Sequence, residues 1–201
     1  MTITTEQIKA LREQTGVGIL DCRKALEDAN GDYDLALENL RAKGLATAAK
    51  RADREASEGV VELYSHGDGR VGVMVEVNCE TDFVARSKEF RNFAHEIALQ
   101  IAASAPSYVR AEEVPEEVLT LRRNVLREQA LEEGKPEEIV DRIIDGRMDK
   151  YLQEISLLNQ EYIRDDKLTV EQLLLENIAA IGENIVIRRF ERWELGESAQ
   201  D

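Results

Sequence analysis

The chain has 201 residues and a formal net charge of −15 at pH 7, because 41 acidic residues outnumber 26 lysines and arginines. This length suits one or two domains with a real core, and 43% apolar against 33% charged residues argues against disorder over most of the chain. The acidic excess, most of it in residues 111–201, argues against nonspecific binding to nucleic acid or anionic lipid, because like charges repel. We interpret it as the solvated face of helices rather than as an acidic recognition patch, and expect no direct nucleic-acid partner.

Targeting signals and metal-binding motifs are missing from the sequence. No apolar run is long enough to cross a bilayer, and residues 1–7 lack the basic and apolar regions of a signal peptide. We therefore expect a cytoplasmic protein that does not bind membranes. Cys22 and Cys79 lie far apart and form no C-x-x-C motif, which indicates two buried thiols and neither a metal site nor a cofactor.

Residues 1–45 are predicted to form a module of three short helices. A capping box at Thr4 begins the first helix, and the glycines within residues 15–18 end it. The second helix follows directly, and the third is capped by Asp32 and closed by Gly44. Such a bundle is close to the size limit for independent folding.

Residues 46–56 are rich in alanine and charge, with few large apolar side chains, so we predict a linker with a helical bias. Lys50, Arg51 and Arg54 form a basic cluster in this stretch. The cluster is either a contact patch or part of a solvated linker.

Residues 57–201 are predicted to form an α+β core domain. Alternation in residues 60–64 and 71–77, around the turn 66–69, indicates a β-hairpin. The stretch 184–195 alternates as well and is predicted to complete a small antiparallel sheet.

Helices are expected to pack on this sheet. The three- and four-residue spacing of apolar side chains in residues 87–104 predicts an amphipathic helix on one face of the hairpin. Similar patterns follow Pro115 and Pro136, and a further helix begins at Thr169.

The sequence offers little support for an enzyme. Residues 67–72 spell G-x-G-x-x-G, but they lie in the predicted hairpin turn rather than between a strand and a helix. His66 is expected at that turn and His95 at the margin of the core, and Leu99 stands where a zinc-binding helix would need its second histidine. We therefore predict a non-enzymatic protein.

One connection combines several residue types suited to binding. Residues 78–84 join the second hairpin strand to the following helix, at the end of the sheet. Thr81 or Asp82 can cap that helix, and Phe83 or Val84 can be its apolar staple. On spacing alone, capping and binding both remain open.

Two longer stretches resemble a known family. Residues 11–26, LREQTGVGILDCRKAL, and residues 76–86, EVNCETDFVAR, are similar to the two signature stretches of the elongation factor Ts family. Both occur in the family's order and at its spacing, and the resemblance covers essentially the whole chain. Conservative departures in the first stretch occur at Val17, Ile19, Leu20 and Arg23.

The resemblance implies a guanine-nucleotide exchange factor that binds the GDP-bound form of elongation factor Tu. It implies that residues 1–45 resemble a ubiquitin-associated (UBA) module, and that the motif of Thr81, Asp82, Phe83 and Val84 contacts the GTPase near its magnesium. The module is expected to bind the same domain elsewhere, through Gly16, Val17, Gly18, Ile19, Cys22 and Lys24. The alternative is a non-exchanging UBA-like interaction scaffold, which has no use for residues 81–84.

Long family members carry two core subdomains and an inserted helical hairpin, whereas residues 57–201 have room for one core subdomain. The chain thus resembles the short class. We expect a homodimer, because the apolar strand 184–195 offers an edge that a second copy can cover.

Overall fold

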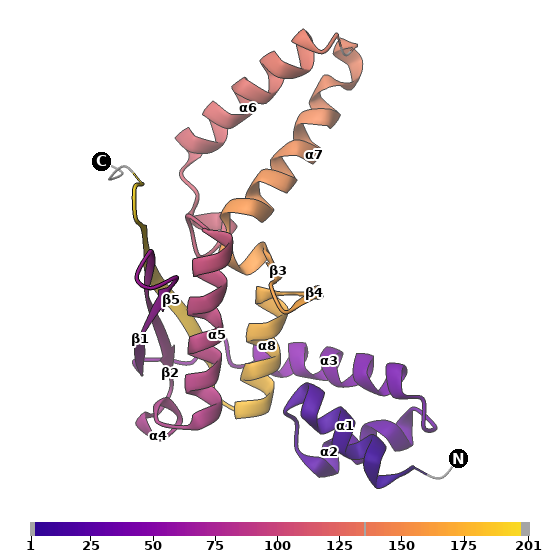
Figure 1. Cartoon of the computed structure of the whole chain (residues 1–201). Helices are drawn as coiled ribbons and strands as arrows, with labels where there is room; N and C mark the ends of the chain where they lie inside the picture. The colour runs from indigo at the N-terminus through magenta and orange to yellow at the C-terminus, as the bar shows by residue number, and fades with distance from the viewer. Residues whose placement is uncertain (1–2, 135, 198–201) are drawn as a thin grey trace.

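The computed structural model describes residues 3–134 and 136–197. A helical module at the N-terminus is followed by a three-stranded sheet, with helices on one of its faces and a helical hairpin projecting from the far end (Figure 1). The predicted α+β class is confirmed. The proposed division into 1–45, 46–56 and 57–201 stays a prediction.

Three helices form the N-terminal module: α1 (Thr5–Thr15), α2 (Ile19–Asp28) and α3 (Tyr33–Ala49). Thr4 caps α1 in the predicted capping box, and Gly16 ends this helix with a positive φ of 65°. The module has its own apolar cluster, which contains Leu11, Cys22, Ala25, Leu26, Ala29, Ala36 and Leu40. The predicted helical stretches are therefore confirmed.

The prediction that Gly44 closes the third helix is wrong, because α3 continues to Ala49. Gly44 lies where α3 meets α8 (Val170–Ile181), and a Cβ atom at this position would lie 3.2 Å from the Cβ of Ala179. The glycine thus permits a close approach of two helices and does not stop one. The continuation also places Ala48, only 2% exposed, in the main core, so part of the predicted linker is a packed helix.

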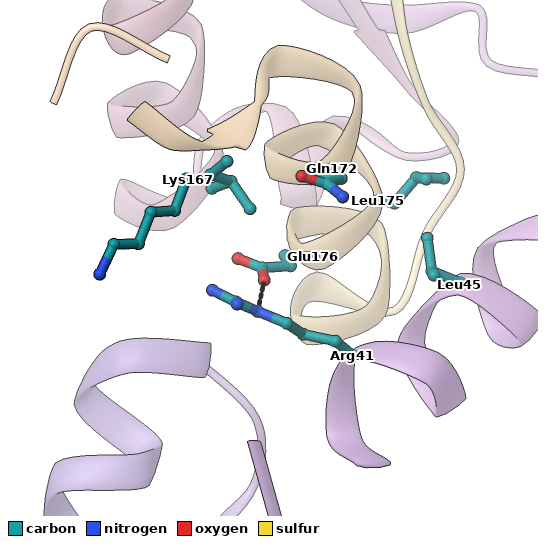
Figure 2. A pocket seen from close by; sticks show the side chains of 7 residues that line it. Arg41, Leu45, Lys167, Gln172, Leu175 and Glu176 are labelled. Carbon is teal, nitrogen blue, oxygen red and sulfur yellow. Dashed lines mark hydrogen bonds and ion pairs between the residues drawn. The ribbon is translucent and has the colours of Figure 1, made fainter. Parts of the chain in front are cut away.

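Further contacts join the module to α8. Arg41 Nε donates a 2.7 Å hydrogen bond to Glu176 Oε1, beside a small cavity of about 70 Å³ (Figure 2). Burial raises the pKa of Glu176, and the nearby Arg41 guanidinium partly opposes that rise. A Cβ at Gly16 would lie 3.2 Å from the Cβ of Ala180. The module is therefore docked on α8 through small side chains and one ion pair.

The sheet has the order β1-β2-β5 and is antiparallel throughout. Its strands are β1 (Glu58–His66), β2 (Val71–Cys79) and β5 (Ile185–Glu194), so the stretch 184–195 completes the sheet as predicted. Residues 67–69 all have positive φ and form the hairpin turn, which confirms that G-x-G-x-x-G here marks a turn.

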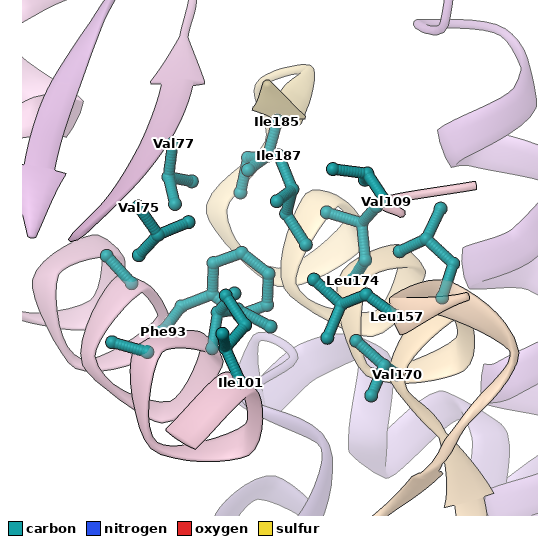
Figure 3. Close-up of a cluster of buried hydrophobic side chains, with 14 of the residues drawn as sticks. Val75, Val77, Phe93, Ile101, Val109, Leu157, Val170, Leu174, Ile185 and Ile187 are labelled. Atoms are coloured by element: carbon teal, nitrogen blue, oxygen red, sulfur yellow. The ribbon is translucent and has the colours of Figure 1, made fainter. Parts of the chain in front are cut away.

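The main core lies between this sheet and two helices. Helix α5 (Lys88–Ser104), capped by Ser87, and α8 pack on the same face of the sheet. Figure 3 shows the apolar side chains that meet there, among them Val75, Val77, Phe93, Ile101, Val109, Leu157, Val170, Leu174, Ile185 and Ile187. One face of the sheet is thereby buried and the other left open.

Five short elements lie outside the predicted ones: α4 (Asp82–Ala85), η1 (Ala111–Glu113), η2 (Leu157–Asn159), β3 (Glu161–Tyr162) and β4 (Asp165–Thr169). The pair β3 and β4 forms a separate two-stranded sheet just before α8. These elements have two to five residues, which is too short for a hydrophobic period to reveal them.

Helices α6 (Glu116–Glu132) and α7 (Glu137–Ile155) form the projecting hairpin (Figure 1). They share an apolar cluster that is separate from the main core and contains Leu126, Ala130, Val140, Ile144 and Met148. Ion pairs cross between the two helices from Arg123 to Asp145 and from Arg147 to Glu133. The helices after Pro115 and Pro136 are confirmed. Their pairing into a helical hairpin was not predicted, because the sequence analysis expected such a hairpin only in long family members.

The close approach at Gly44 predicts opposite effects of one substitution at two helical glycines. Gly44→Leu should lower the free energy of unfolding by about 1 kcal/mol or more, because overpacking exceeds the gain in helix propensity. Gly146→Leu on α7 should raise it by about 0.5–1 kcal/mol, since a Cβ at Gly146 meets nothing within 4 Å. Urea unfolding measures both, and equal stabilisation by the two variants would contradict the docking of α3 on α8.

Candidate functional site

Within residues 3–134 and 136–197, no group of three or more His, Cys, Asp or Glu side chains is arranged to hold a metal ion. No helix in these ranges is long and apolar enough to span a membrane. His66 Nδ1 lies 3.0 Å from the Tyr64 hydroxyl oxygen, and His95 Nδ1 lies 3.0 Å from Glu62 Oε1. Both histidines are exposed and contact residues of β1, which fits a structural role at the sheet edge.

The two cysteines are free and buried, as predicted. Burial raises the pKa of both thiols, that of Cys79 to about 11, so they remain protonated at neutral pH. Cys79 Sγ donates a 3.3 Å hydrogen bond to the carbonyl oxygen of Thr81. This thiol therefore helps to fix the connection after β2 and is not poised as a nucleophile.

Thr81 begins the short helix α4 at the end of the sheet. Its hydroxyl oxygen accepts a hydrogen bond from the Val84 amide at 3.4 Å, so Thr81 caps α4. The longer helix that Thr81 or Asp82 was expected to cap, α5, is capped by Ser87 instead. Asp82 is the first helical residue instead and forms a 3.1 Å ion pair with Arg86. Val84 and Ala85 anchor α4, because they pack against the main core.

Phe83 projects from this anchored helix into solvent. Its exposed fraction is 83%, so the interpretation of Phe83 as an apolar staple is wrong, and the packed residue is Val84. A large aromatic side chain at this exposure adds nothing to the core. The geometry instead offers an aromatic side chain on a fixed support, which is the arrangement of a residue that anchors a protein interface.

Glu183, in the turn between α8 and β5, holds the loop before Phe83. Its carboxylate accepts a 2.7 Å hydrogen bond from the Thr81 hydroxyl and 3.0 Å bonds from the backbone N–H groups of Glu80 and Thr81. Sequence reasoning missed this residue, because it is separated from Thr81 by 102 positions and no local pattern marks it.

The six predicted binding residues of the module differ in how accessible they are. Cys22 is fully buried in the module, whereas Gly16 is exposed and lies against α8. Ile19 is 49% exposed and Lys24 is exposed as well, so both are accessible to a partner. The other two residues, Val17 and Gly18, form the turn between α1 and α2, where Gly18 is the N-cap of α2.

Leu20 extends the exposed apolar surface of α2 and was not among the predicted residues. It is 77% exposed and follows Ile19 directly. Its position off the buried face of α2, which contains Cys22, Ala25 and Leu26, was the available signal. Figure 1 shows α4 and the α1–α2 pair at the same end of the molecule, away from the α6–α7 hairpin.

Exposed apolar side chains on two docked supports are suited to contact with another macromolecule. A family model described as elongation factor TS matches residues 37–197. The chain belongs to the elongation factor Ts family, which supplies nucleotide-exchange factors for translation elongation. The resemblance noted in the sequence is thereby confirmed.

Close relatives support the same assignment over nearly the full length. The chain is 58% identical over 195 residues to elongation factor Ts of Carboxydothermus hydrogenoformans, covering 97% of this chain and 90% of the relative. It is 58% identical over 198 residues to that of Caldanaerobacter subterraneus, covering 98% and 99%. It is 57% identical over 195 residues to that of Moorella thermoacetica, covering 97% and 96%.

The exposure of Phe83 predicts how two phenylalanines differ in stability. Phe83→Ala should change the free energy of unfolding by no more than about 0.5 kcal/mol, as for an ordinary surface substitution. Phe93→Ala should lower it by about 3–5 kcal/mol, because Phe93 is only 3% exposed in the main core. Urea unfolding compares the two, and a loss above about 2 kcal/mol for Phe83→Ala would show that its ring is packed.

Proposed function

We propose that this chain is a guanine-nucleotide exchange factor that binds GDP-bound elongation factor Tu and accelerates GDP release. The observation that carries the proposal is the exposed Phe83 ring on the anchored helix α4, in a chain of the elongation factor Ts family. A non-exchanging scaffold is the weaker alternative, because it does not explain why the Phe83 ring is exposed on an anchored helix.

The proposed exchange needs no covalent chemistry. If bound factor weakens GDP binding by some free energy, bound GDP weakens factor binding by the same amount. The chain therefore acts without a catalytic base or a cofactor of its own, and is not an enzyme in the sense of making or breaking bonds. Its place of action would be the cytoplasm, where translation elongation occurs.

Two residues of the motif have distinct proposed roles. The Phe83 ring would insert into the GTPase and hold displaced side chains there, as an aromatic wedge. The Asp82 carboxylate would compete electrostatically around the bound magnesium. Loss of magnesium coordination and of phosphate contacts would then speed GDP release.

The N-terminal module would provide a second contact with the same partner. Ile19 and Lys24 are accessible on α2, and Leu20 enlarges the apolar area. Since α3 is docked on α8, both contacts are presented by one body, and binding at the first raises the effective concentration at the second.

We also propose that the chain forms a homodimer through the open face of its sheet. Apolar side chains on that face are exposed, namely Val61, Leu63, Met74 and Trp193. The β5 edge, which the sequence suggested, is less suitable, because Arg188, Arg189 and Arg192 lie along this strand and its register shifts opposite Glu76. A second copy would cover the open face symmetrically.

Phe83→Ala should slow GDP release from elongation factor Tu by about thirtyfold, corresponding to about 2 kcal/mol for an interface anchor. Asp82→Asn keeps the shape and removes the charge. If Asp82→Asn slows GDP release less than Phe83→Ala does, steric displacement is the main effect. If the two variants slow release to a similar extent, competition around magnesium contributes as well. Stopped-flow fluorescence of a labelled GDP measures all rates.

Leu121→Ala is the control for Phe83→Ala. Leu121 is 67% exposed on α6, outside the motif and the N-terminal module, so this variant should exchange at the rate of the unsubstituted chain. A Phe83→Ala protein that unfolds normally and exchanges at the unsubstituted rate would contradict the proposed mechanism.

Light scattering tests the homodimer. At micromolar concentration the chain should show twice its 22.7 kDa mass, and Leu63→Glu should return it to the monomer mass. Leu121→Glu places the same charge on an equally exposed leucine outside the sheet and should stay dimeric. A monomer mass for the unsubstituted chain would contradict the proposed dimer, and a dimeric Leu63→Glu protein would exclude this face.

A further inference from the structure

Three segments that are distant in the sequence meet beneath the motif: residues 80–81 before α4, residues 182–184 between α8 and β5, and residues 52–54 after α3. Glu183 connects the second segment to the first through the three hydrogen bonds to Glu80 and Thr81. Gly182 ends α8 with a φ of 89°, a conformation that lets the chain turn at the end of the helix.

The connection is reciprocal. Glu80 Oε1 accepts a 2.7 Å hydrogen bond from the backbone N–H of Asn184, and Glu80 Oε2 lies 3.4 Å from Arg54 Nη1. The Asn184 amide donates to the carbonyl oxygens of Ala52 and Arg54, at 3.3 and 2.8 Å, and Asn184 is only 3% exposed. Each of the two acidic side chains thus holds the backbone of the other's loop.

We infer that Glu183 is a positioning residue for nucleotide exchange, which fixes the loop before α4 so that Phe83 is presented in one orientation. The inference rests on the proposed function, because it assigns Glu183 a role through the motif. Glu183 itself would not contact the nucleotide. Its effect would pass through Thr81 to the helix that carries Phe83.

The chemistry of the Thr81 hydroxyl explains this dependence. A hydroxyl has one hydrogen to donate, and Glu183 Oε1 accepts it at 2.7 Å, which leaves a lone pair directed at the Val84 amide. A helix of four residues has no cooperative stability of its own, so α4 depends on this cap and on its anchors in the core. Without Glu183, the hydroxyl turns freely and two backbone N–H groups lose their acceptor.

Hydrogen exchange in the free protein tests the structural half of the inference. In Glu183→Ala, the backbone amides of residues 80, 81 and 84 should exchange about tenfold faster or more, while amides within α8 keep their protection. Glu171→Ala is the control, because Glu171 is an exposed glutamate in the first turn of α8 and Glu183 lies just after the last turn. The Glu171→Ala substitution should leave all these exchange rates unchanged. Unchanged exchange at residues 80, 81 and 84 in Glu183→Ala would overturn the inference.

GDP release from elongation factor Tu tests the functional half. With Glu183→Ala, the maximal release rate at saturating factor should fall about tenfold, because the Phe83 ring is no longer held in its productive position. The half-saturating concentration should change by less than about threefold, because the contacts of the N-terminal module remain. A merely structural role would leave the maximal rate of the folded fraction unchanged.

Variants of Thr81 provide a second test that does not require the Glu183→Ala protein to fold. Thr81→Ser keeps the hydroxyl and should keep the maximal rate of GDP release. Thr81→Val keeps the shape without the hydroxyl, and its maximal rate should fall about as much as that of Glu183→Ala. Combining Thr81→Val with Glu183→Ala should lower the maximal rate by less than the product of the two single effects, because both remove the hydrogen bond between Thr81 and Glu183.

The outcomes separate this inference from the proposed function. Suppose that Phe83→Ala slows GDP release while Glu183→Ala and Thr81→Val release GDP at the rate of the unsubstituted chain. This result would overturn only the positioning role. A Phe83→Ala protein at the unsubstituted rate would contradict the proposed function itself. Slower GDP release with Phe83→Ala, Glu183→Ala and Thr81→Val, together with an unchanged rate for Thr81→Ser, supports both the positioning role and the proposed function.

Discussion

Helix α8 supports both the N-terminal module and, through the turn that follows it, the connection to α4. On one side its small residues Ala179 and Ala180 receive Gly44 and Gly16 of the module. At its C-terminal end, the turn that follows holds the connection to α4 through Glu183. Between these contacts, the buried face of α8 completes the main core against the sheet. The relative placement of the module and of the motif therefore depends on one helix.

This placement has a physical consequence for binding. Ordering a mobile loop or domain at an interface consumes free energy that would otherwise contribute to affinity. Here the hydrogen bonds to Thr81 and the ion pair between Arg41 and Glu176 already exist in the free chain. The Phe83 ring is thus exposed on a support that needs little further ordering. In the proposed mechanism, the binding free energy is available to weaken the contacts of GDP, because the two ligands oppose each other.

Local signals predicted most of the helices and strands. The capping box at Thr4 marks the start of α1, the apolar spacing after Thr169 marks α8, and glycines around Asp68 mark the hairpin turn. Gly44 was misread, because a glycine that ends a helix and one that allows a close helix contact have the same local sequence context. Only the partner helix, more than a hundred residues further along the chain, distinguishes the two cases.

The candidate site shows the same limit. Residues 81–84 were found from their place after a strand and from a family resemblance, and spacing alone left capping and binding open. The structure shows that Thr81 caps α4 while Phe83 remains exposed. Glu183 could not be found from sequence, since a single glutamate in an acidic chain has no distinguishing pattern until the fold brings it to Thr81.

A distance distribution between two spin labels shows whether α8 presents the module and the motif as one rigid unit. Nitroxide labels at Lys9→Cys on α1 and Lys88→Cys on α5 would report the distance by pulsed electron paramagnetic resonance, while the buried Cys22 and Cys79 resist labelling. We predict one narrow distribution in the free chain that is unchanged by elongation factor Tu. A broad distribution in the free chain that narrows on binding would contradict rigid presentation by α8, because the module would then dock only in the complex.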